Sequence, residues 1–195
     1  MSALKVFSSV TDLAPLLDLG GKVVFRWPMA AMGFCSRTPA NFPWDIKIAT
    51  SALFHPPDYQ ASHLEMLKAQ KMTLIHEFLH LYNGDHLKPV TPCRLGKDPY
   101  ETAVEKATAR FFRGSDSEVI VRDLVEELLL RPNCSFIYEV AEDYKTPFFR
   151  YQTRLASLLL KEINGQIPLH GGERRLKLLA QYGPAAKDRL YSLLR

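Results

Sequence analysis

The sequence has no long apolar run: its richest stretches, 124–130 and 155–160, are far shorter than the ~20 residues that a membrane-spanning helix needs. Its amino-terminal segment has no basic stretch followed by an apolar one, so no secretory signal is expected. The cysteines, Cys35, Cys93 and Cys134, form no CxxC pair and no even set for disulfides. These absences predict a protein of the reducing cytoplasm without membrane contact.

The composition predicts a folded chain with one unevenly charged end. Of 195 residues 47% are hydrophobic, which argues against disorder and suits one domain with a small appendage. The net charge of +4 lies within 165–195, where six basic residues stand against two acidic ones. We therefore expect a domain over 1–165 and a basic helical tail over 166–195, packed on it or appended to it. Such a tail can bind nucleic acid or an acidic partner, or be a solvated helical face.

Two kinds of local pattern divide the chain. Apolar residues dominate 22–27, and apolar and polar residues alternate over 45–50, so we expect a strand at each and an irregular loop over 28–43. From Asp58, a candidate helix cap, the pattern is helical, with helices expected over 58–82, 98–114, 118–130, 147–163, 174–181 and 185–194. A small β-containing part followed by an all-helical part makes an α+β fold.

The motif HEFLH at residues 76–80 is the strongest chemical signal in the chain. Residues four apart on a helix point in nearly the same direction, so the imidazoles of His76 and His80 can bind a single Zn²⁺. Glu77 between them can act as the general base on metal-bound water. Apolar residues cover the opposite arc of the helix, which would anchor it in the core and turn the histidines towards a cleft.

Two residues compete as the third zinc ligand. His86 follows His80 in the spacing HExxHxxNxxH, and Glu105 lies near the middle of the next expected helix. Glu101 lies on the same helix face as Glu105, one turn earlier, but it is interpreted as the partner of Asp98 in a capping box at the helix start.

Two families of metallopeptidase resemble this region. The stretch HEFLHLYNGDH resembles the zinc motif of the metzincins and of the WLM metalloproteases, which act on proteins crosslinked to DNA, and this implies His86 as the third ligand. The stretch EKATARFF at 105–112 resembles the ExxAxxFA glutamate helix of the ImmA/IrrE-type gluzincins, with Thr108 and Phe112 where alanine is usual. That resemblance implies a zincin-like fold with Glu105 as the third ligand. It is preferred because metzincins carry a downstream methionine turn, whereas all five methionines here precede the motif.

The gluzincin resemblance implies a zinc-dependent metalloendopeptidase that cleaves a protein or peptide substrate. His76, His80 and Glu105 would bind Zn²⁺, and Glu77 would activate zinc-bound water. One alternative is a WLM-like protease acting on DNA-associated proteins. Another is a non-catalytic zinc-binding interaction protein, with Cys93 as the fourth ligand that closes the site.

Further expectations concern the substrate. The strand at 45–50 is expected to be the edge strand along which zincins align an extended substrate. Three residues are candidates for the donor that stabilises the oxyanion: Tyr100, Arg110 and Tyr144. Three other histidines have no metal-ligand spacing and are expected to be ordinary polar residues: His55, His63 and His170.

Overall fold

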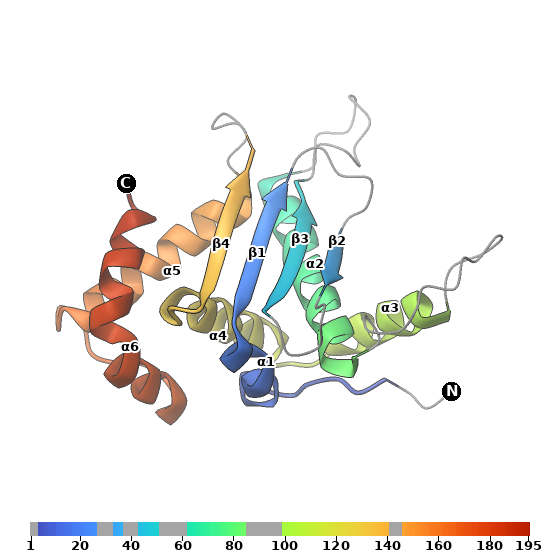
Figure 1. Ribbon diagram of the computed structural model, residues 1–195, viewed down its shortest axis with the longest axis horizontal. Coiled ribbons are helices and arrows are strands. Elements are labelled where there is room, and N and C mark those ends of the chain that lie inside the picture. The colour runs from blue at the N-terminus through green and yellow to red at the C-terminus, as the bar shows by residue number, and fades with distance from the viewer. Residues whose placement is uncertain (1–3, 27–32, 37–42, 51–61, 85–98, 141–145) are drawn as a thin grey trace.

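Helices and strands alternate irregularly along the part of the chain that the computed structural model describes, which is residues 4–26, 33–36, 43–50, 62–84, 99–140 and 146–195 (Figure 1). In chain order the elements are η1 (a 3₁₀ helix, Val10–Leu13), α1 (Ala14–Leu19), β1 (Gly21–Arg26), β2 (Gly33–Ser36), β3 (Trp44–Ala49), α2 (His63–Asn83), α3 (Pro99–Phe111), α4 (Ser117–Leu130), β4 (Cys134–Glu139), α5 (Pro147–Ile163) and α6 (Glu173–Ser192). The described chain thus has mixed helix and strand content. None of these helices is both long and apolar enough to cross a bilayer.

The four strands form one sheet in the order β2-β3-β1-β4. β1 pairs in parallel with β3 and with β4, whereas β2 pairs antiparallel with β3 and forms one edge. The central position of β1 suits its sequence, because Val23, Val24 and Phe25 are all buried, as is usual in parallel sheets. The prediction that the strand near 45–50 forms the edge was wrong. That strand, β3, is interior, and the edge beside it is β2, which lies in the segment expected to be an irregular loop.

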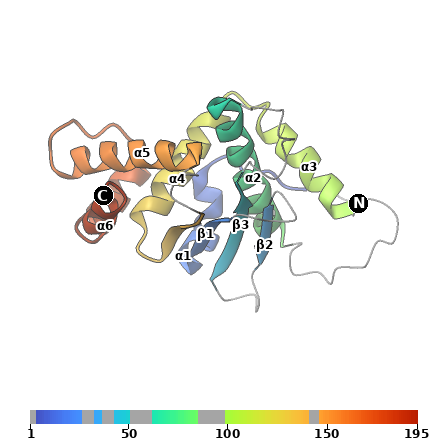
Figure 2. The ribbon, with the colours of Figure 1, turned by 90° about the horizontal axis from the view of Figure 1, so that it is seen from above.

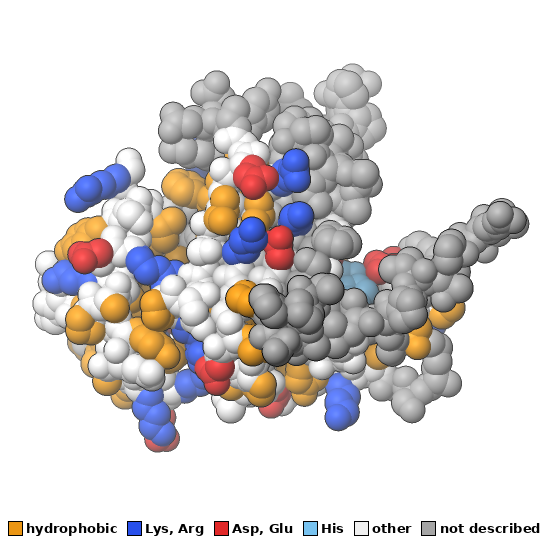
Figure 3. All heavy atoms as spheres, viewed as in Figure 1, with side chains coloured by type: hydrophobic (Ala, Val, Ile, Leu, Met, Phe, Trp, Pro, Cys, Tyr) orange, Lys and Arg blue, Asp and Glu red, His pale blue; other side chains and the backbone are white. Residues whose placement is uncertain are grey.

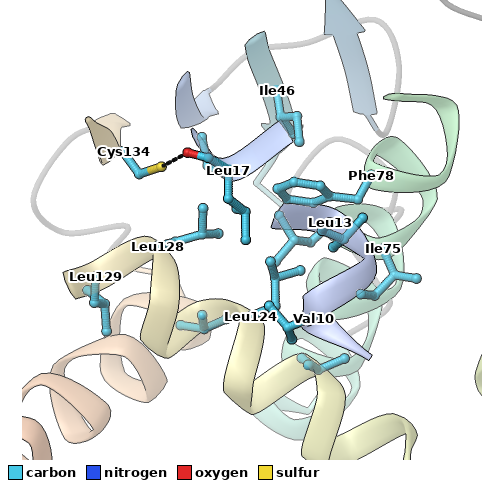
Figure 4. Packing of buried hydrophobic residues seen from close by; sticks show 14 of the residues in the cluster. Val10, Leu13, Leu17, Ile46, Ile75, Phe78, Leu124, Leu128, Leu129 and Cys134 are labelled. Atoms are coloured by element: carbon cyan, nitrogen blue, oxygen red, sulfur yellow. Dashed lines mark hydrogen bonds between the residues drawn. The ribbon is translucent and has the colours of Figure 1, made fainter. Parts of the chain in front are cut away.

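Helices α2, α4 and α5 lie on one side of this sheet (Figure 2). In the core between the layers, Ile46 of β3 lies close to Phe78 of α2, and Leu124 belongs to the same cluster from α4 (Figure 4). Leu13 and Leu17 from the amino-terminal turns fill the space between the helices and the sheet (Figure 4). One face of α2 is therefore fixed in the core.

The ends of α2 follow from capping chemistry. Ser62 accepts a hydrogen bond from the Glu65 backbone N–H at 3.2 Å, and the Glu65 carboxylate accepts one from the Ser62 N–H at 2.8 Å. The helix ends at Gly84, whose φ of 67° is left-handed and suits glycine. The predicted helix end near residue 82 is confirmed, because α2 extends to Asn83. The predicted start of this helix at Asp58 was wrong, because α2 begins later, at His63, and is capped by Ser62; Asp58 itself lies outside the described residues.

The second half of the chain is not all-helical as predicted, because β4 follows α4 and pairs along the whole of β1. Two of its side chains contact α5: Phe136 packs on Phe148 with ring centroids 5.9 Å apart, and Tyr138 donates a hydrogen bond to Gln152 at 2.7 Å. Along β4 exposed residues alternate with buried or half-buried ones, but this pattern spans only six positions, which is a weak signal in the sequence. Such a short strand becomes stable only through pairing with β1, which lies far away in the sequence.

The tail contains one helix rather than the two predicted. α6 continues through Pro184 although proline removes a backbone hydrogen bond and costs about 3 kcal/mol in a helix interior. Leu178, Ala186 and Leu190, on both sides of the proline, are buried, and α6 packs against α4 and α5. This packing outweighs the cost of the proline and joins α6 to the common core.

Basic residues at the start of α6 bind carboxylates of α4 and α5. Arg174 donates a hydrogen bond to Glu127 at 3.1 Å, and Glu127 also accepts one from Arg131 at 3.1 Å. The guanidinium of Arg175 lies 2.8 Å from the Glu162 carboxylate. These pairs connect three helices through buried carboxylates.

The tail has fewer free charges than its sequence suggests. Arg189 donates to the backbone carbonyls of Arg131 and Cys134, so Arg189, Arg174 and Arg175 are all engaged within the protein. A nucleic acid or acidic partner at 165–195 stays a prediction. It would rest mainly on Lys187 and Arg195, and on Lys177, which forms an exposed pair with Glu173.

Glu127→Gln is expected to lower the free energy of unfolding by about 3 kcal/mol, because Arg131 and Arg174 lose their buried carboxylate. Urea unfolding followed by circular dichroism measures this change. Glu173→Gln is the control, since it breaks an exposed pair with Lys177 and should cost less than about 0.5 kcal/mol. Similar losses in the two variants would contradict the structural role of Glu127.

Candidate metal centre

Helix α2 presents His76 and His80 from successive turns of one face. Their Nε2 atoms lie 3.1 Å apart and their ring centroids 4.8 Å apart. The side chains are 17% and 15% exposed, so solvent reaches both rings. Histidine and acidic atoms show together at the surface on the right of the face drawn in Figure 3. The predicted geometry of the histidine pair is therefore present.

Glu101 of α3 completes a cluster with this pair. Its Oε1 lies 3.1 Å from His76 Nε2, and its Oε2 lies 3.3 Å from His80 Nε2. Within α3 the buried residues Val104, Thr108 and Phe111 follow Glu101 at intervals of three and four residues, so all four share the helix face that packs inward. The packing of α3 against α2 thus carries the Glu101 carboxylate to the histidines.

The donor set fits a zinc ion. Zinc bonds of about 2.1 Å in tetrahedral geometry place neighbouring ligand atoms about 3.4 Å apart. The distances within the cluster, 3.1, 3.1 and 3.3 Å, are close to that value. Two imidazole nitrogens and one carboxylate oxygen are also the three protein ligands of a well-known class of catalytic zinc site. His76, His80 and Glu101 would hold the metal.

Electrostatics keep Glu101 in its charged form. Hydrogen bonds from the rings of His76 and His80 hold the pKa of the Glu101 carboxyl well below its usual range. The carboxylate is therefore ionised at neutral pH, which is the form that binds a metal.

Glu77 points away from solvent and lies beneath the edge strand β2. Its side chain is buried, and burial raises the pKa of its carboxyl. The charges of His76 and His80 and a hydrogen bond from the Cys35 thiol act in the opposite direction. A carboxyl with a raised pKa in a partly apolar setting is suited to accepting and returning a proton near neutral pH.

Gly33 of β2 allows this close approach. A Cβ atom at Gly33 would lie 2.2 Å from Glu77 Oε1 and 2.6 Å from Thr73 Cγ2, far inside van der Waals contact. A glycine at this position is therefore required for the backbone of β2 to pass directly over the carboxyl of Glu77.

Glu101, rather than the predicted third ligand Glu105, is the carboxylate that the structure brings to the histidines. Among the described residues, the group whose ligand atoms all lie within 4.8 Å of one another consists of His76, His80 and Glu101. Glu105 follows one turn later on α3 and is exposed, and His86 lies outside the described residues. The sequence interpretation had assigned Glu101 to helix capping, whereas its carboxylate binds the two histidines. Glu101 lies on the same face of α3 as the apolar residues Val104 and Phe111, and this spacing was the sequence signal that could have identified it.

The structure also shows where the candidate oxyanion donors and the remaining histidines lie, as far as they are described. Arg110, a candidate oxyanion donor, donates a hydrogen bond to the Leu4 carbonyl at 2.7 Å and is engaged there. Tyr100 precedes Glu101 on α3 and is half-buried. His63 and His170 are exposed, as expected of ordinary polar residues at the surface. Three candidates fall outside the described residues: His55, Cys93 and Tyr144.

Comparisons with protein-family models, with curated proteins and with solved structures found no match. The zincin resemblance therefore stays an expectation based on the motif and its spacing. What the structure defines is a mixed helix and strand protein with a His-His-Glu cluster between two helices.

Glu101→Ala is expected to abolish zinc binding, because it removes one of three converging ligand atoms, whereas Glu105→Ala should bind as much zinc as the wild type. Elemental analysis of zinc per chain after loading and dialysis measures this difference. Glu105→Ala is a matched control, since it lies on the same helix one turn away. Loss of zinc from Glu105→Ala but not from Glu101→Ala would support the sequence-based choice. His86→Ala, analysed in parallel, tests the other alternative.

Gly33→Ala is expected to destabilise the protein by about 1–3 kcal/mol, the usual cost of overpacking, because the new methyl group overlaps Glu77. In a Glu77→Ala background the same change should cost less, because the most severe overlap has been removed. Chemical unfolding of the four proteins of this double-mutant cycle gives the interaction free energy. An identical cost in both backgrounds would show that Gly33 and Glu77 do not press on each other.

Proposed function

We propose that the protein is a zinc-dependent metalloendopeptidase of the HExxH type that cleaves a protein substrate. His76, His80 and Glu101 bind the metal, and Glu77 is the general base. The observation that carries this proposal is the convergence of three donor atoms at metal-ligand spacing, with a buried carboxylate next to one of them in the chain.

Each group of the site has a defined task. A bound zinc ion supplies Lewis acidity for the scissile carbonyl and lowers the pKa of water. Glu77 takes a proton from the attacking water and returns it to the leaving amine. Burial, which raises the pKa of Glu77, makes its carboxyl a stronger base than a solvated glutamate and also a usable acid. The Cys35 thiol, which donates a hydrogen bond to Glu77, orients this carboxyl.

The position of β2 supports a polypeptide substrate. β2 is the edge strand of the sheet, and its residues Gly33 and Cys35 adjoin Glu77. An extended peptide that pairs with an edge strand gains main-chain hydrogen bonds largely independent of its sequence. A substrate added to β2 would run past Glu77, so that its backbone carbonyls approach the general base. The role expected for the strand at 45–50 is therefore reassigned to its neighbour β2.

Glu77→Gln is expected to keep zinc and lose proteolysis, because an amide retains the shape of the side chain but cannot take a proton. The loss should be at least about 10²-fold, the usual contribution of general-base catalysis. Zinc-loaded protein is incubated with a proteome-derived peptide library, and new termini are quantified by mass spectrometry with and without a chelator.

Glu105→Gln is the control for this experiment, since it makes the same change at an exposed carboxylate of α3. It should retain the wild-type cleavage rate. Full activity of Glu77→Gln would exclude Glu77 as the base. Zinc-loaded wild type that cleaves no peptide would instead favour the alternative of a non-catalytic zinc site, in which Glu77 is dispensable.

A further inference from the structure

The second ring nitrogen of His76 faces a hydroxyl group of α3. Thr108 Oγ1 lies 3.4 Å from His76 Nδ1 and 2.9 Å from the backbone carbonyl oxygen of Val104. Thr108 is 5% exposed, so water does not compete freely for this hydroxyl. His76 is therefore bounded by Glu101 at Nε2 and by Thr108 at Nδ1, both from the same helix.

The direction of these hydrogen bonds follows from counting protons. A threonine hydroxyl has one proton to donate, and the Val104 carbonyl can only accept. This carbonyl is also the nearer partner, at 2.9 Å against 3.4 Å for His76 Nδ1, so we assign the proton of Thr108 to the bond with Val104. The Thr108 oxygen is then an acceptor towards His76. It can pair with an Nδ1–H group, and it has no proton to offer an unprotonated Nδ1.

This arrangement matters for metal binding. A neutral imidazole that binds a metal through one nitrogen carries its proton on the other, and that N–H group needs an acceptor. Nε2 is the atom of His76 that faces Glu101 and His80, so Nδ1 is the nitrogen that must keep the proton. Thr108 provides the acceptor, and it also restrains rotation of the ring.

We propose that Thr108 is a positioning residue that, once Nε2 of His76 binds the metal, holds the remaining ring proton on Nδ1 and so orients Nε2 as the metal ligand. This inference rests on the proposed zinc site. It gives a function to a buried hydroxyl on the helix that packs against α2.

The test compares Thr108→Val with Thr108→Ser in the full-length protein. Zinc dissociation constants are measured by competition with a chromophoric chelator. Thr108→Val should weaken zinc binding by about 10–100-fold, the usual effect of removing a hydrogen-bond partner of a metal-binding histidine. Thr108→Ser keeps the hydroxyl and should bind zinc like the wild type.

Thr153→Val is the matched control. Thr153 also donates its hydroxyl proton to a carbonyl four residues earlier in its helix, that of Phe149, at 2.7 Å. It lies on α5, and its hydroxyl bonds to its own helix rather than to any of the three proposed ligands, so its substitution should leave zinc affinity unchanged. A loss in Thr153→Val as large as that in Thr108→Val would assign the effect to helix stability and overturn the proposal.

A second readout needs no catalytic activity. In zinc-loaded wild type, the Nδ1–H group of His76 should be visible by ¹H–¹⁵N NMR because its hydrogen bond slows exchange with water. The signal should be lost in Thr108→Val and present in Thr108→Ser. Wild-type affinity and an unchanged signal in Thr108→Val would overturn the role of Thr108 alone. Wild-type protein that binds no zinc would overturn the metal site and this inference together.

Discussion

The contact between α2 and α3 is the interaction on which the candidate site depends. α2 contributes both histidines, and α3 contributes Glu101 and Thr108, which meet opposite nitrogens of the His76 ring. Neither helix could hold this arrangement alone. α2 is fixed because its other face is buried against the sheet, and α3 is fixed by the burial of Val104 and Phe111. A rotation of α3 about its axis would move Glu101 out of reach, so the rigidity of the core is transmitted directly to the cluster.

The edge of the sheet provides the second part of the site. β2 crosses over Glu77 at Gly33, where a side chain would overlap the carboxyl. Cys35, whose thiol hydrogen-bonds Glu77, lies two residues further along the same strand. The residues proposed as metal ligands and the proposed general base therefore lie on neighbouring sides of α2, the former towards α3 and the latter towards β2. Enclosure by β2 raises the pKa of Glu77, while exposure on the side of α3 keeps the histidines accessible. One helix thus supports two different electrostatic environments.

Much of the helical structure could be predicted because its signals are local. The end of α2 at Gly84 and the extent of α5 are observed as expected, since capping residues and apolar periodicity act within a few turns. β2 and β4 were missed because short strands owe their stability to partners distant in the chain. The break expected at Pro184 is absent for a similar reason: burial of residues before and after the proline against α4 and α5 outweighs a local preference.

The sequence alone determined that His76 and His80 lie on one face, because two residues four apart on one helix share a face whatever surrounds them. It also placed Glu77 beside them. Which carboxylate joins the histidines was decided by the tertiary structure. The spacing of Glu101 with Val104 and Phe111 indicates the inward face of α3, but only the packing of α3 against α2 brings that face to the histidines. The rotation of α3 that selects Glu101, and that sets Thr108 against His76, follows from the packing of apolar side chains drawn from the whole chain. Such packing is a collective property, and no local pattern encodes it.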